Sequence, residues 1–122
     1  MNLKKIWDNA VAEHNSGDYH EAHELFEDLW LELEDRREKD TVQTLAQADA
    51  LAVHIKTGNI RAAQRLMRQL PELVQTFPSS YNGIDLRTMK AWINDMVAHI
   101  PSSGEVKTVT ESEPPKLIKS RS

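Results

Sequence analysis

The sequence predicts an all-α fold, a compact bundle of about five helices paired as antiparallel helical hairpins over residues 1–101, followed by a disordered, flexible tail over residues 102–122. Apolar residues recur at helical spacing in several segments. Gly, Asn and Pro clusters separate these segments. No alternation of convincing strand length occurs before the tail. The 122 residues, 39% of them hydrophobic, suffice for one domain with a modest core.

The first two helices form the first predicted hairpin. The first helix spans about residues 3–15, its apolar stripe being continued by His14 as a boundary residue, and Gly17 suits a left-handed stop. Asp18 caps the second helix, with Glu21 three residues later as in a capping box. We expect this helix to end near Glu34 or Arg37, before a polar connection over residues 35–40.

The third helix, predicted to begin at Asp40 or Thr41 and to end near Thr57, is apolar over most of its circumference. Such a helix is typically buried at the centre of a bundle. Its polar exceptions are therefore informative: they are Gln47, Asp49 and His54. We expect Asp49 to be either exposed on a surface of small residues or buried against Arg or His.

The remaining chain predicts two more helices. The fourth spans about residues 59–75, and Pro71 either kinks it or begins a new turn. A loop follows over residues 77–83. Asp85 caps the fifth helix, which Pro101 ends. The last segment is rich in Ser, Pro, Lys and Glu, a composition typical of disordered chains.

Charge and composition limit the function classes. The formal net charge of −4 gives no general attraction for nucleic acid, and the absence of cysteine excludes disulfides, thiol catalysis and thiolate metal sites. No apolar run approaches membrane-spanning length, so we expect a cytoplasmic protein without membrane contact. The stretch from Asp18 to Asp40 holds ten acidic residues, whereas a basic stripe follows later: Arg61, Arg65 and Arg68. The two charged regions are either solvated helix faces or surfaces that bind a partner.

The second helix also carries two histidines near glutamates. His23 borders the apolar face, and Glu27 lies one turn later. The zinc-peptidase pattern His-Glu-x-x-His is not met, and neither is the Glu-x-x-His order of ferritin-like metal sites. Three interpretations stay open: a partly buried pair in which His23 bonds Glu27 or a neighbouring helix, a metal site using His23, Glu27 and His54, or a metal-free pocket. The first is preferred, and no cofactor is expected.

Three ordered blocks carry a resemblance to a known family. The stretch from Gly17 to Trp30 (GDYHEAHELFEDLW) resembles the signature of the "domain of unknown function 309" family. The blocks QTLAQ with the later His54 and Gly58-Asn59, and YNGID from Tyr81, resemble the family's second and third blocks. The resemblance implies a compact helical fold, an intracellular bacterial or plastid setting and no established activity.

The resemblance also implies a polar cluster between the second and third helices: His23, Glu24, Glu27, Trp30, Gln47 and His54. The sequence departs from the family pattern at three positions. An aromatic residue is usual where this chain has His20, a glycine where it has Thr44, and a small apolar residue where it has Asp49.

The preferred functional interpretation is a small interaction or structural accessory protein, not an enzyme, with an unidentified protein partner. The alternative is a metal-dependent or metal-free hydrolase-like site at the polar cluster. The sequence designates no catalytic residue.

Overall fold

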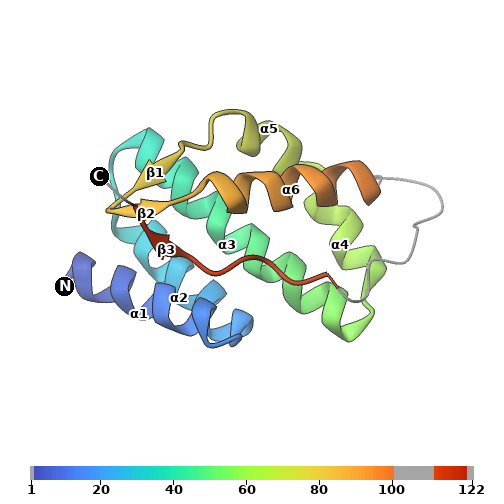
Figure 1. Ribbon diagram of the computed structural model, residues 1–122, viewed down its shortest axis with the longest axis horizontal. Coiled ribbons are helices and arrows are strands. Elements are labelled where there is room, and N and C mark those ends of the chain that lie inside the picture. The colour runs from blue at the N-terminus through green and yellow to red at the C-terminus, as the bar shows by residue number, and fades with distance from the viewer. Residues whose placement is uncertain (1, 101–111, 121–122) are drawn as a thin grey trace.

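The computed structural model describes residues 2–100 and 112–120, and it confirms the all-α class with antiparallel helical hairpins (Figure 1). The described residues form six helices and three two-residue strands. The helices are α1 (Leu3–Asn15), α2 (Tyr19–Glu32), α3 (Arg36–Thr57), α4 (Ile60–Leu66), α5 (Leu70–Gln75) and α6 (Arg87–His99); the strands are β1 (Ser80–Tyr81), β2 (Ile84–Asp85) and β3 (Ile118–Lys119). No helix in these ranges is both long enough and apolar enough to cross a membrane.

The hairpin of α1 and α2 forms as predicted because its turn contains both stop and start signals. Gly17 has a φ of +88°, which L side chains rarely adopt. The Asp18 side chain then accepts a hydrogen bond from the Glu21 backbone N–H, at 3.1 Å, and so caps α2. The two helices pack along their length, and α2 packs equally closely on α3.

The central helix α3 begins four residues earlier than Asp40. The Asp35 side chain accepts a hydrogen bond from the Glu38 backbone N–H, at 3.0 Å, so the polar run predicted as a connection forms the first turns of the helix. As predicted, α3 is the buried centre of the bundle, and Figure 1 shows it running through the middle of the molecule. Ten of its residues are buried: Thr41, Val42, Thr44, Leu45, Ala46, Ala48, Asp49, Leu51, Ala52 and Ile55.

The predicted fourth helix is two short helices. Backbone hydrogen bonds of the i to i−3 type close the turns at Met67, Arg68 and Gln69, and these tighter turns end α4. Pro71 lies in the first turn of α5, where its missing N–H costs no helical hydrogen bond. Of the two alternatives for this proline, the structure has the new helical turn.

The small sheet was not predicted. β1 and β2 form a hairpin through Asn82 and Gly83, which both have positive φ values, +49° and +77°. An Asn-Gly pair with this geometry is the preferred turn of a two-residue hairpin. β3 pairs antiparallel with β2 at the opposite edge. Strands of two residues are too short to show the alternation by which strands are recognised in a sequence.

Residues 112–120, which we call the C-terminal strap, cross the bundle in an extended path (Figure 1). Asn15 at the end of α1 donates a hydrogen bond to the Leu117 carbonyl, at 2.9 Å, and accepts one from the Leu117 N–H, at 2.7 Å. The Leu117 side chain is only 3% exposed. This part of the predicted tail is therefore fixed to the domain, because its apolar residues reach the core. The rest of that tail lies outside the described residues.

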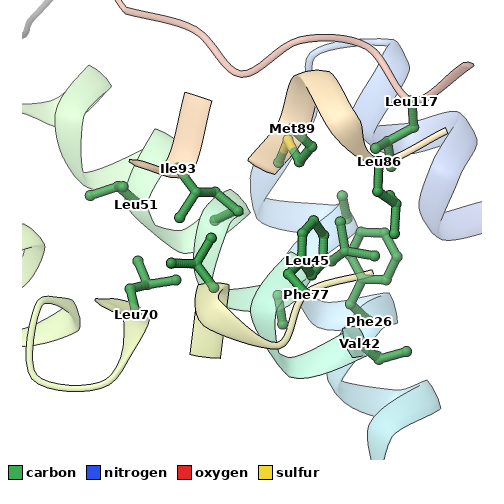
Figure 2. Close-up of a cluster of buried hydrophobic side chains, with 14 of the residues drawn as sticks. Phe26, Val42, Leu45, Leu51, Leu70, Phe77, Leu86, Met89, Ile93 and Leu117 are labelled. Carbon is green, nitrogen blue, oxygen red and sulfur yellow. The ribbon is translucent and has the colours of Figure 1, made fainter. Parts of the chain in front are cut away.

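One hydrophobic core joins all of these elements. Figure 2 shows part of it, with side chains from α2, α3, α5, α6 and the strap directed to the same interior. The largest fully buried side chains are Phe26, Leu29, Leu45, Leu51, Leu70, Leu86, Met89, Ile93, Met96, Ile100, His14 and Val42. A polar side chain, His14, is thus as deeply buried as the aliphatic residues.

The packing of the strap predicts opposite outcomes for two neighbouring substitutions. Leu117→Ala should lower the free energy of unfolding by about 2–3 kcal/mol, because it leaves a cavity under the strap. Ile118→Ala, at a side chain that is 66% exposed, should change it by less than about 0.5 kcal/mol. Urea denaturation of both variants measures the difference. Equal, small effects would show that the strap does not contribute to the core.

Candidate functional site

His23 joins α2 to α3. Its Nδ1 lies 2.7 Å from the backbone carbonyl oxygen of Ala46, and its Nε2 lies 3.2 Å from Glu27 Oε1. A carbonyl oxygen can only accept, so Nδ1 carries the hydrogen of this bond. The ring nitrogens of His23 are therefore both in contact with partners, one on the neighbouring helix and one on its own helix.

Trp30 near the end of α2 and Lys39 of α3 form a second contact between these two helices. The Lys39 ammonium lies 4.1 Å from the centre of the Trp30 ring and donates hydrogen bonds to the carbonyl oxygens of Trp30 and Leu33. A cation over an indole face is a stabilising arrangement. Lysine also interacts favourably with the last carbonyl groups of a helix, so the Lys39 side chain caps the C-terminus of α2.

The structure brings together part of the predicted polar cluster. A hollow of about 180 Å³ is lined by Glu27, Trp30, Leu31, Gln43, Ala46 and Gln47. Gln47 turns its amide nitrogen to the Gln69 side chain, and its oxygen is buried without a hydrogen-bond partner among the described residues. Glu24 lies outside this hollow, exposed on the outer face of α2.

His54 lies further along α3, close to the basic stripe. Burial lowers the pKa of His54, and the positive charge of Arg65 and the proximity of His23 lower it further. Arg61 and Arg65 on α4, and Arg68 just after it, are all exposed. The imidazole of His54 thus lies near the positive charge of Arg65, and its neutral form is favoured. Within residues 2–100 and 112–120, no three His, Cys, Asp or Glu side chains gather as a metal-binding group.

A buried pair of titratable side chains lies on the other side of α3. His14 Nδ1 is 2.6 Å from Asp49 Oδ1, and His14 Nε2 is 2.8 Å from the carbonyl oxygen of Pro115 in the strap. His14 is 2% exposed and Asp49 is fully buried. Of the two alternatives for Asp49, the structure has burial against a histidine, whereas the prediction that His14 is a boundary residue is wrong.

The hydrogen-bond partners of His14 determine which of its ring nitrogens carry hydrogen. Both oxygens facing His14 accept hydrogen bonds when Asp49 is ionised, so both ring nitrogens must then carry hydrogen. Burial lowers the pKa of His14, but the hydrogen bond to Asp49 and its negative charge outweigh burial and leave that pKa above 6.5. Burial also raises the pKa of Asp49 against the opposing effect of His14. The pair therefore shares one proton and titrates as a unit.

An apolar groove of about 800 Å³ lies between α1, the end of α2 and the β1–β2 hairpin. Trp7 contacts the Phe26 and Tyr81 rings edge to face. The Tyr81 hydroxyl donates a hydrogen bond to Glu38, at 2.8 Å; burial, together with this bond, raises the pKa of Tyr81. The groove is lined by Leu3, Lys4, Trp7, Asp8, Val11, Leu29, Leu33, Glu38, Tyr81, Asn82, Gly83, Ile84 and Lys119.

The groove was missed in the sequence because its walls come from four distant segments. Within the first helix, the signal for the groove is its set of apolar residues, and a sequence pattern cannot show which of them line the core and which line the groove. The Asn82-Gly83 turn signal is the one feature that could have placed a hairpin beside this helix.

The first half of the chain matches a described family. Residues 7–66 match the Domain of unknown function (DUF309). This chain contains a DUF309 domain. It comprises α1 from Trp7 onward, α2, α3 and α4, and so includes the His23–Ala46 contact and the His14–Asp49 pair.

One curated relative is an uncharacterized protein from Aquifex aeolicus (strain VF5). It is 28% identical to this chain over 102 residues, which are 81% of this chain and 30% of the relative. The chain thus spans less than a third of the length of that relative. No solved structure matches the chain significantly.

The shared proton of His14 and Asp49 predicts a pH dependence. Because the folded-state pKa of His14 is raised, the stabilisation is fully present below pH 6.5 and is lost as the pH rises through the raised value. One linked proton gives a slope of at most about 1.4 kcal/mol per pH unit. Asp49→Asn should flatten this dependence, because an amide can donate to His14 Nδ1 while Nε2–H still donates to Pro115.

Urea denaturation at several pH values above 6 measures how the free energy of unfolding changes with pH. The control variant is Asp28→Asn, at an exposed position, which should have the same slope as wild type. Equal slopes in wild type and Asp49→Asn would exclude the shared proton as its source.

Proposed function

We propose that this DUF309 protein is a protein-interaction module whose groove between α1 and the β1–β2 hairpin binds an apolar peptide segment of a partner. The observation that carries this proposal is the groove itself. Its volume of about 800 Å³ lies within the range of ligand-binding clefts, about 300–1,000 Å³.

The composition of the groove favours a peptide with apolar side chains and polar ends. Aliphatic side chains from α1 and α2 form its walls, and Leu3 at its edge is 38% exposed. Asp8 and Lys4 form an ion pair of 2.8 Å on one rim, and Lys119 of the strap also lines it. An apolar centre with a charged rim is the usual anatomy of a protein interface.

The rigid elements around the groove support binding without large rearrangement. The ring contacts of Trp7 fix one wall, and the hydrogen bond between Tyr81 and Glu38 ties the hairpin to α3. Groups that are already ordered lose little conformational entropy on association. A preformed groove therefore retains more of the free energy of apolar burial.

The relative from Aquifex aeolicus is consistent with an accessory role. The similarity covers only 30% of its chain, so a region like this one occurs there beside a longer stretch of other polypeptide.

The polar cluster at His23 has a structural role in this proposal. Both nitrogens of His23 are occupied, Nδ1 by the Ala46 carbonyl and Nε2 by the Glu27 carboxylate. A histidine held in this way fixes the register of two helices. In this proposal the cluster supports the scaffold that carries the groove.

Panning of a random peptide library displayed on phage tests the groove. We expect enriched peptides that are rich in apolar residues, with binding weakened at least tenfold by Val11→Arg or Leu33→Arg, which place a charge in the groove. The matched control is Leu31→Arg, an exposed leucine of α2 outside the groove.

Circular dichroism of each variant establishes that it is folded. Enriched peptides that bind the groove variants as tightly as wild type, or a library that yields no specific binders, would contradict the proposal.

A further inference from the structure

A second surface, distinct from the groove, is formed by one face of α2, α3 and α4. We infer that this α2–α3–α4 face binds a second copy of the same chain in a two-fold symmetric dimer. Its residues are Glu24, Glu27, Asp28 and Leu31 of α2, Gln43, Gln47 and His54 of α3, and Arg61, Arg65 and Arg68 on and after α4.

Side-chain contacts connect the three helices of this face in a fixed order. His23 bonds α2 to the Ala46 carbonyl of α3, and Gln47 of α3 bonds Gln69 in the turn after α4. His54 of α3 lies within electrostatic range of Arg65. The helix α3 thus forms the middle of the face, with α2 on one side and α4 on the other.

The two sides of the face carry opposite charges. Glu24, Glu27 and Asp28 are exposed on the α2 side, whereas the three arginines are exposed on the α4 side. Between them, the α3 side chains that belong to this face are the neutral Gln43 and Gln47 and His54, a histidine that favours its neutral form. The opposite charges therefore lie on one surface without forming ion pairs with each other in the structure described.

The α2 side of the face also has apolar surface that a partner would cover. Leu31 is 68% exposed, the most exposed large hydrophobic side chain of the described residues, and it lines the hollow of about 180 Å³ with Trp30 and Ala46. Burying a leucine side chain is worth about 1.5–3 kcal/mol. An exposed leucine beside a hollow is therefore a favourable contact point.

Two-fold symmetry makes this face complementary to itself. In a two-fold contact the same patch is used on both subunits, and each residue meets its counterpart reciprocally. If the axis lies in the plane of the contact and crosses between the two α3 helices, the acidic side of each copy meets the arginines of the other. This attraction then occurs twice. The Leu31 side chain of each copy, which lies on the acidic side, then packs against the α4 side of the other copy. We infer a second copy as the occupant because the acidic and basic sides of this one face complement each other.

A charge-exchange experiment tests the dimer by sedimentation equilibrium at about 100 μM protein and low salt. Wild type should have twice the monomer mass. The variants Arg61→Glu/Arg65→Glu and Glu24→Lys/Asp28→Lys should each lose at least tenfold in dimer affinity, because like charges then meet. An equimolar mixture of the two variants should dimerise again, because acidic and basic sides are restored in the mixed pair.

The control variant Lys5→Glu/Lys116→Glu changes the net charge by the same amount as the arginine variant, at exposed positions outside the face, and should dimerise like wild type. Raising the salt concentration should weaken the wild-type dimer. A monomeric wild type, variants that dimerise normally, or a mixture that stays monomeric would each overturn the inference. None of these outcomes bears on peptide binding, since the groove residues are unchanged.

Discussion

The burial of α3 is the constraint on which the rest of the structure depends. Small residues such as Ala46, Ala48 and Ala52 let other helices approach its backbone closely, and α2 packs along it more extensively than any other element. A buried helix offers few polar groups, yet two histidines bond to it from outside. His23 of α2 reaches the Ala46 carbonyl, and His14 of α1 reaches the Asp49 side chain. Because hydrogen bonds are directional, these contacts specify how both N-terminal helices lie on α3.

This arrangement separates structural chemistry from binding surfaces. Deep in the core, the His14 ring couples α1 to α3 and to the C-terminal strap through its two nitrogens, one bonded to Asp49 and one to the Pro115 carbonyl. His23 performs a similar function nearer the surface. The apolar groove and the charged α2–α3–α4 face lie on the outside of this scaffold and use different residues. His23, the histidine of the family signature, contacts the backbone of a neighbouring helix, and we propose that recognition takes place at the groove and the α2–α3–α4 face instead.

Local signals in the sequence were sufficient for the helices and insufficient for contacts between distant segments. Gly17 and Asp18 predicted the first hairpin correctly, because helix stops and caps depend on a few neighbouring residues. The start of α3 was misplaced, since Asp35 is one of several acidic residues that could have been the cap. The polar cluster was predicted as six residues, but Glu24 and His54 lie apart from the shared hollow. The His14–Asp49 pair and the strap depend on contacts across 35 and about 100 residues, which periodicity does not report.

The central claim is that two histidines fix α1 and α2 on α3, and nitrogen-15 NMR of the imidazole side chains tests it most directly. His23 should carry hydrogen on Nδ1, and at pH 6.5, below the raised pKa of His14, the His14 ring should carry hydrogen on both nitrogens. A His23 ring with hydrogen on Nε2 alone, or a His14 ring that loses its second hydrogen below pH 6.5, would contradict this account.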